Sequence, residues 1–221
     1  MAEPSRIPAR DGVRADARRN RERILTAARA VFAERGIDAP MATVARRAGV
    51  GVATLYRHFP TRDALVRGAY AHQVETCSRA LTDALADPDP WRGFRHLVET
   101  VCALHREERG FPAAFLAAFP ESTSEHGHRA EQDLKALVRR AQAAGALRPD
   151  FHPSDIAVVL LAHCGLVAAL PDDAAASRRL VAYLLQSFRA DAATAPLPLP
   201  SGLTLPGLLT AVGDPGRRPP A

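Results

Sequence analysis

The sequence predicts an all-α fold in two parts, a small N-terminal three-helix part and a larger C-terminal helical part. Apolar residues recur at the three- and four-residue spacing of amphipathic helices, and no segment sustains the alternation expected of a β-strand. Gly and Pro residues separate the helical segments, most clearly from Asp87 to Pro90. Charge divides the chain as well: residues 1–62 hold 13 arginines and 6 acidic residues, whereas residues 63–221 hold 16 basic and 18 acidic residues.

The N-terminal part is expected to contain an arm and three helices. Residues 1–15 carry two prolines, a glycine and many charges, which indicates a disordered basic arm. A helix follows over residues 16–35, and shorter helices follow over residues 41–48 and 51–58; a glycine comes directly after each of the first two. From the last of these helices, the side chains expected to point inward are Val52, Leu55 and Phe59.

The C-terminal part is expected to consist of consecutive helices. Thr61 is a suitable N-cap for a helix that should continue to about Ala86. Further helices are expected at about 90–108, 112–120, 125–144, 153–170 and 172–192, with Pro153 in the first position of its helix. From Ala195 onward, seven prolines exclude a regular element.

Residues 40–59 combine two short helices and a glycine-containing turn, a pattern that fits a helix-turn-helix. The second helix of such a motif enters the major groove of DNA with its N-terminal end, where small or polar groups are needed. Groups of this kind are Gly51, Ala53 and Thr54, while Tyr56, Arg57 and His58 follow at the end where phosphates run. Arg62 begins the next helix, whose free N–H groups favour a phosphate.

Two alternatives compete with DNA binding at this stage. A helix–glycine–helix also occurs as an αα-corner in unrelated helical proteins, and an arginine-rich end can be a merely solvated one. Three features occur together here: the basic arm, the polar side chains at the end of the second helix, and Arg62 at the start of the next helix. Their combination favours DNA binding.

Residues 17–70 closely resemble the TetR/AcrR family of regulators. The matching residues are Arg23-Ile24-Leu25, Ala28, Phe32-Ala-Glu-Arg-Gly36, Val44-Ala45, Ala48-Gly-Val50, Thr54-Leu-Tyr56, His58-Phe59 and Thr61-Arg62-Asp63-Ala-Leu65. The body over residues 90–192 is similar to a subgroup common in actinobacterial-type members, through Phe115, Leu116, Leu137, Gly145 and Ile156.

The resemblance implies an all-α homodimer that binds a palindromic double-stranded DNA operator, usually as a repressor, and responds to a small-molecule effector. It implies a helix-turn-helix DNA-binding domain over residues 16–63, a ligand-binding and dimerisation domain over residues 64–194, and a Pro-rich tail over residues 195–221. The expected DNA-binding residues are Thr43, Arg46, Gly51, Val52, Ala53, Thr54, Tyr56, Arg57, His58, Thr61 and Arg62.

The helix-turn-helix motif departs from the family pattern at several positions, most of them in its second helix, which is expected to enter the major groove. Ala53 replaces the usual Gly or Pro, and Val52 replaces a frequently polar residue, so it is expected to meet a thymine methyl group. Pro40 stands where Ser or Thr often caps the first helix, and Thr43 or Arg46 is expected to substitute in gripping phosphate. Base readout is therefore expected to depend on Thr54, on methyl contacts and on arginines of residues 14–21 that reach the minor groove.

In the C-terminal body, two adjacent apolar helices at the end of the chain predict a four-helix interface between two copies; the alternative is that both fill the protomer core. The expected dimer residues are Val159, Leu160, Val167, Leu180, Leu184 and Phe188. A largely apolar effector pocket, again with ordinary core as the alternative, is expected from Trp91, Phe94, Leu97, Val101, His105, Phe111, Phe115, Phe119, Leu134, Val138 and His163.

Other classes of function are disfavoured. The chain has no GxSxG, P-loop, dinucleotide or HExxH motif, so an enzyme is not expected, nor is a cofactor. Scattered cysteines and the isolated His126-Gly-His128 pair do not predict a metal site. The sequence contains no run of 18 apolar residues, so no membrane span is expected. The polar, Arg-rich N-terminus is not a secretory signal, so a cytoplasmic protein is expected, associated with the bacterial nucleoid if it binds DNA. A non-specific or architectural nucleic-acid-binding protein is the remaining alternative.

Overall fold

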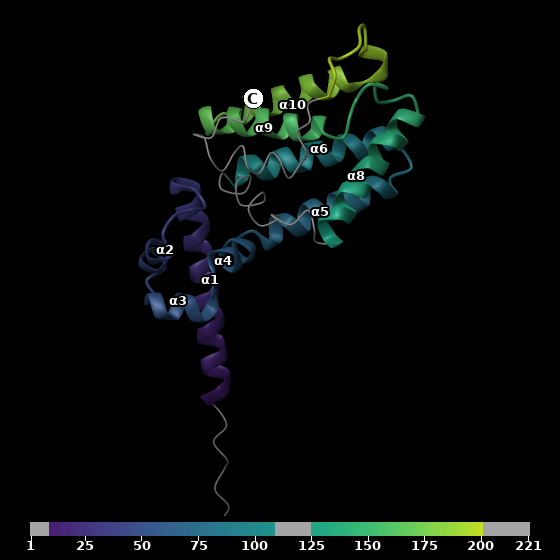
Figure 1. Ribbon diagram of the computed structural model, residues 1–221. Helices are drawn as coiled ribbons and strands as arrows, with labels where there is room; N and C mark the ends of the chain where they lie inside the picture. Colours follow the sequence, from purple (N-terminus) through teal and green to yellow (C-terminus); the bar gives the residue numbers. More distant parts are fainter. Residues whose placement is uncertain (1–8, 109–124, 201–221) are drawn as a thin grey trace, which may run out of the picture. The chain divides into compact units, whose positions relative to one another are not determined.

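The computed structural model describes residues 9–108 and 125–200, and every regular element within these ranges is helical (Figure 1). The all-α prediction is confirmed. The chain divides into two compact units, Met1–Ala69 and Tyr70–Ala221. Within the described helices, none is long and apolar enough to cross a membrane.

The first unit contains α1 (Ala9–Arg35), α2 (Met41–Ala48), α3 (Val52–His58) and α4 (Arg62–Ala69). Two glycines with positive φ separate the first three: Gly36 at +78° donates its N–H to Phe32, and Gly49 at +64° caps α2. Buried side chains of α1, among them Ile24 and Phe32, pack with those of α2 and α4. The helices are thereby fixed around one small apolar core.

The start of α1 corrects one expectation. Residues 9–15, expected within a disordered arm, belong to this helix. Pro8 is the last proline before it, and the following residues are mostly Ala and Arg, which are good helix formers, so the single Gly12 does not prevent helix formation. The arm residues 1–8 lie outside the described residues.

The second unit contains α5 (Ala71–Ala86), α6 (Pro90–Glu107), α8 (Glu125–Ala143), α9 (Asp155–Ala169) and α10 (Ala174–Phe188), followed by a 3-10 turn over Ala190–Ala192. α6 is central, because it packs against α5, α8, α9 and α10. Asp89 fixes its start by accepting hydrogen bonds from the N–H groups of Trp91 and Arg92. The segment expected as a helix over 112–120 lies outside the described residues.

Two helix boundaries differ from the prediction. The helix expected to run from Thr61 to Ala86 is interrupted at Tyr70, whose ψ of 15° is not helical and whose side chain is fully buried. Gly68 lies two residues before the break, but its φ is not positive, so it does not end α4 as a C-cap glycine would. The break instead coincides with the buried Tyr70 ring. Pro153 precedes α9 instead of opening it, because Ser154 is the N-cap.

The core of the second unit is centred on three aromatic rings. Phe94 of α6 meets Phe151 edge-on at 5.4 Å between ring centroids, and Phe151 meets Phe188 of α10 at 4.9 Å. Trp91 stacks on Phe94 at 5.8 Å. The two edge-to-face pairs, Phe94–Phe151 and Phe151–Phe188, have favourable ring geometry and join three separate stretches of the chain into one core.

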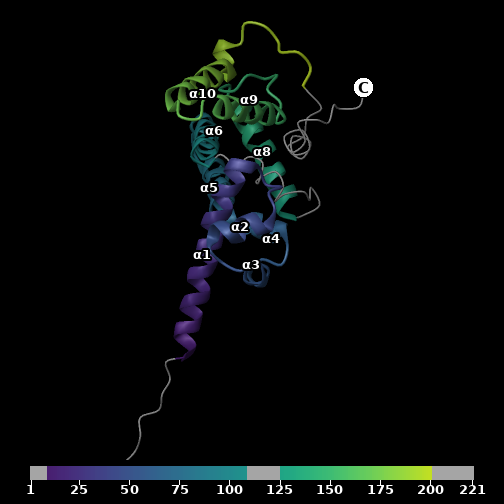
Figure 2. The same cartoon turned by 90° about the vertical axis from the view of Figure 1, so that its left-hand side faces the viewer.

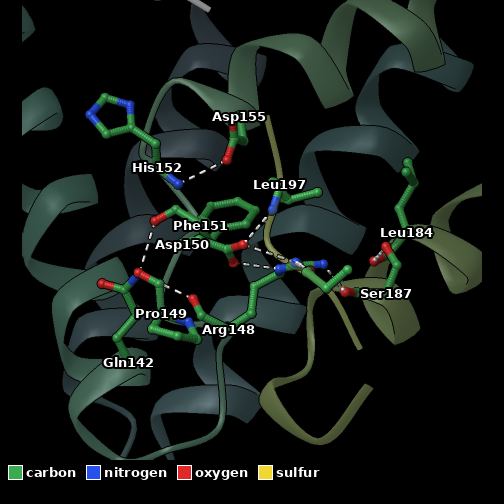
Figure 3. Close-up of polar contacts among 11 residues, drawn as sticks. Gln142, Arg148, Pro149, Asp150, Phe151, His152, Asp155, Leu184, Ser187 and Leu197 are labelled. Carbon is green, nitrogen blue, oxygen red and sulfur yellow. Dashed lines mark hydrogen bonds and ion pairs between the residues drawn. The ribbon is translucent and has the colours of Figure 1, made fainter. Parts of the chain in front are cut away.

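The described part of the C-terminal tail is held against the turn between α8 and α9 (Figure 3). Arg148, which is buried, forms a two-pronged ion pair with Asp150 and donates a 2.8 Å hydrogen bond to the carbonyl oxygen of Ala195. Asp150 accepts a 2.7 Å hydrogen bond from the N–H of Leu197. These bonds lower the pKa of Asp150 to about 2. Residues 195–197 are thus tied down although they form no regular element.

Candidate nucleic-acid interface

The short helix α3 has one buried face and one exposed face. Leu55 and Phe59, four residues apart, are buried in the first unit, while Val52 and Tyr56 are 43% and 45% exposed. The expectation that Val52 points inward is therefore wrong. Its exposure is compatible with the other expectation, that Val52 lies on the face of α3 that contacts DNA bases. Leu55 is the buried residue within α3 and Phe59 directly follows the helix, so the inward contacts lie toward its C-terminal end and Val52, its first residue, stays in solvent.

The polar groups of α3 are preorganised by a contact within the helix. Arg57 donates a 2.9 Å hydrogen bond from Nη2 to the hydroxyl oxygen of Thr54. Gly51 and Ala53 are exposed, and His58 is half-buried beside Phe59. The contact restrains a guanidinium and a hydroxyl on the exposed side of the helix, where both could meet a polyanion.

The corner between α3 and α4 contains the next two predicted residues. The hydroxyl oxygen of Thr61 accepts a 3.1 Å hydrogen bond from the N–H of Ala64, so Thr61 is the N-cap that the sequence predicts. Arg62 pairs with Asp38 at 3.1 Å, and Asp38 is 80% exposed. Such an exposed pair is worth at most about 1 kcal/mol, so a phosphate group can compete for the guanidinium. The partner Asp38 was not foreseen from the sequence.

A further arginine-rich surface lies beside α2. Pro40 precedes α2 without a side-chain cap, Thr43 is half-buried and Arg46 is exposed. An open groove of about 710 Å³ between α1 and α2 is lined by Arg19, Arg23, Arg46 and Arg47, among other residues. Arg23 is held there by a 2.8 Å hydrogen bond to the carbonyl oxygen of Ala48. The basic character predicted for the N-terminal third is thus concentrated in a groove on this unit.

Most predicted pocket residues of the second unit lie in its core. Phe94, Leu97, Leu134 and Val138 are buried there, and Trp91 and Val101 pack against them. Phe111, Phe115 and Phe119 lie outside the described residues. His105 and His163 are buried together, with ring centroids 5.9 Å apart. Their role in binding an effector stays a prediction.

The predicted dimer residues need a correction. Val159, Val167 and Phe188 are 5%, 5% and 8% exposed, so they pack inside the protomer and are not available to a second copy. Leu160, Leu180 and Leu184 are half-buried. The large apolar residues that α9 and α10 leave exposed are Val158, Leu161 and Tyr183, and the exposed Leu170 directly follows α9. α9 is apolar on every side, so its spacing does not distinguish the inner face from the outer face.

The buried His105 is expected to make the stability of the protein depend on pH. Burial, together with the nearby His163, lowers the pKa of His105 from 6.5 to about 3. Below pH 6.5 the unfolded chain binds a proton that the folded chain binds only near pH 3. The contribution of His105 to the free energy of unfolding is therefore complete above pH 6.5. It is lost as the pH falls toward 3, at about 1.4 kcal/mol per pH unit.

Between pH 7 and pH 5, the free energy of unfolding is expected to fall by about 2 kcal/mol more in the natural chain than in His105→Gln. Urea unfolding at several pH values measures this difference. Equal slopes for the natural chain and His105→Gln would contradict the assignment.

Comparison with known proteins agrees with this geometry. The family "Bacterial regulatory proteins, tetR family" matches residues 24–69, and the family "Transcriptional regulator SbtR-like, C-terminal domain" matches residues 89–190. HTH-type transcriptional regulator UidR of Escherichia coli K12 is 26% identical over 161 residues, covering 68% of this chain and 81% of UidR.

The chain is also similar to solved structures, and PfmR below shares its fold. The TetR regulator SCO0520 of Streptomyces coelicolor is 31% identical, with 76% of this chain and 98% of SCO0520 covered and a TM-score of 0.48. The TetR family regulator PfmR of Thermus thermophilus is 24% identical, with 72% of this chain and 93% of PfmR covered and a TM-score of 0.56. The two family matches together span most of the described chain, which therefore belongs to the TetR family and is a DNA-binding transcriptional regulator.

Proposed function

We propose that the chain is a cytoplasmic repressor that binds a palindromic operator as a homodimer and is released by a small, largely apolar molecule. The observation that carries this proposal is the exposed side of α3, where the exposed Val52 and Tyr56 adjoin the Thr54–Arg57 pair. Exposed apolar side chains beside preorganised polar ones suit a base edge next to a phosphate backbone.

The contacts divide by chemistry. Val52 and Ala53 are suited to thymine methyl groups, and Thr54 to a base edge. Tyr56, Arg57 and His58, together with Thr43, Arg46, Thr61 and Arg62, are suited to phosphates and fix the register of the helix. Gly51 lets the backbone approach. Binding that depends on this many cations should weaken steeply as salt concentration rises.

Dimerisation is proposed through the exposed side of α9 and α10, which lie side by side in the second unit (Figure 2). Val158, Leu161 and Gly165 follow one another along one side of α9, and all three are exposed. Tyr183 of α10 is 55% exposed. An apolar strip of this kind is suited to a second copy of the same strip, and two copies would place two reading helices on a palindrome.

The test of the reading face is a gel shift with Tyr56→Ala. Loss of the ring and of its hydroxyl group, which is placed to contact a phosphate, is expected to weaken operator binding by roughly 10- to 100-fold, as for a hydrogen bond to a charged group. Tyr56→Phe, which keeps the ring, separates the ring from the hydroxyl group. A folded, dimeric Tyr56→Ala protein with unchanged operator affinity would refute the assignment of α3 as the reading helix.

The second candidate function is non-specific nucleic-acid binding, which the arginine-lined groove beside α2 favours. Competition with unrelated duplex DNA separates the two functions. A specific reader should prefer its operator by a factor of roughly 10³ or more, whereas an architectural binder should show nearly equal affinities.

A further inference from the structure

A cluster of buried polar side chains lies where α6, α9 and α10 meet. His105 of α6 is 4% exposed and His163 of α9 is completely buried. Nδ1 of His105 lies 3.3 Å from Sγ of Cys164, and Nε2 of His163 lies 2.9 Å from the hydroxyl oxygen of Ser177 on α10. Polar groups this deep in an apolar body need hydrogen-bond partners, so any that lacks one requires an explanation.

Among the described residues, one nitrogen atom of the cluster has no hydrogen-bond partner. Nδ1 of His163 is buried and makes no hydrogen bond to any described residue, whereas Nε2 is already engaged by Ser177. An unsatisfied buried polar atom costs about 1–3 kcal/mol. Val159 and Val167, one turn away on either side along α9, are buried and apolar. The imidazole therefore presents one unused polar atom in apolar surroundings.

The charges around this atom limit what it can bind. Burial lowers the pKa of His163, and the positive charge of Arg106 lowers it further, so the ring is neutral at physiological pH. A neutral ring gives an anion no charge to pair with, and Arg106 disfavours a cation. The fitting group is a neutral one that forms a hydrogen bond, and a hydroxyl can donate or accept according to the tautomer of the ring.

Metal and thiol chemistry fit the cluster poorly. Within the described residues, no three His, Cys, Asp or Glu side chains are placed to hold a metal ion. Burial raises the pKa of Cys102 and of Cys164 to about 12, so neither forms the thiolate that oxidation requires.

We propose that Nδ1 of His163 anchors the effector by a hydrogen bond, and that the effector is a neutral, largely apolar molecule carrying an alcohol or phenol hydroxyl. This inference rests on the proposed effector-responsive function. Binding of the hydroxyl satisfies an atom that is otherwise unpaired, so the protein should distinguish a hydroxyl compound from the hydrocarbon of the same shape.

The test uses 4-propylphenol and propylbenzene as matched probes on the full-length protein. Calorimetry is expected to show that the phenol binds roughly tenfold or more tightly than the hydrocarbon, as one satisfied buried group implies. His163→Leu should abolish this preference. His96→Leu, which changes an exposed histidine of α6, should retain it.

A second readout needs no variant. With ¹⁵N-labelled histidine, the Nδ1 resonance of His163 is expected to shift on addition of the phenol and not of propylbenzene. Equal affinities for the two probes, no binding of either at millimolar concentration, or an unmoved Nδ1 resonance under saturation would overturn the proposal. Operator binding by the ligand-free protein is measured separately, so failure of this inference is distinguishable from failure of the proposed repressor.

Discussion

Gly165→Glu is expected to convert the proposed dimer into a monomer while the protomer stays folded. A Cβ atom at Gly165 would meet no other atom within 4 Å, and glutamate favours a helix more than glycine does. In a dimer, the carboxylate would lie in the apolar strip formed with Val158 and Leu161, where burying an unpaired charge costs several kcal/mol. Loss of the paired reading heads should lower operator affinity by a factor of roughly 10²–10⁴.

Analytical ultracentrifugation and a gel shift on the same samples check this expectation. Ala130→Glu adds the same charge to an exposed helical position on α8, away from the strip, and should remain dimeric. A dimeric Gly165→Glu protein with normal operator affinity would show that the copies associate through another surface.

Gly93→Ala is expected to destabilise the second unit, although alanine usually stabilises a helix. At this position α6 crosses α5 so closely that a Cβ atom would lie 2.4 Å from the carbonyl oxygen of Ala84 and 3.1 Å from its Cα. Backbone cannot move aside as a side chain can. Overpacking of this kind costs about 1–3 kcal/mol, and it outweighs the gain of up to about 1 kcal/mol in helix propensity.

Thermal unfolding measures the result, with a fall of several degrees in the melting temperature expected for Gly93→Ala. Gly165→Ala is the matched control, because it also replaces a glycine inside a helix, its Cβ atom meets open space within the protomer, and its small apolar methyl group suits the apolar strip. It should leave the melting temperature unchanged or raise it slightly. Equal changes in melting temperature for the two substitutions would show that the close crossing of α5 and α6 is not the reason why residue 93 must be glycine.

The helices themselves could largely be predicted from the sequence, because helical spacing and Gly or Pro breakers are local signals. The buried pair Leu55 and Phe59 follows from this spacing, and so does the cap at Thr61. The break at Tyr70 was not predicted, because the nearby Gly68 lies inside α4 and a single glycine within a helical pattern is an ambiguous signal. A buried ring set by packing overrides the continuous local propensity.

The faces of the helices were harder to predict. On α9 nearly every residue is apolar, so Val159 and the exposed Val158 look alike in sequence, although one is buried in the protomer and the other is not. Contacts between distant residues were not predictable either: Arg62 pairs with Asp38, and Asp150 binds the N–H of Leu197. Such contacts depend on the folded chain and leave no spacing signal.

Selection of binding sites from random duplex DNA, followed by measurement of the bound stoichiometry, tests the central claim most directly. The protein is expected to enrich an inverted repeat and to bind it with two protomers per duplex, roughly 10³-fold or more tightly than unrelated DNA. Enrichment of no sequence, or of a site without two-fold symmetry bound by one protomer, would contradict the account of a dimeric operator reader.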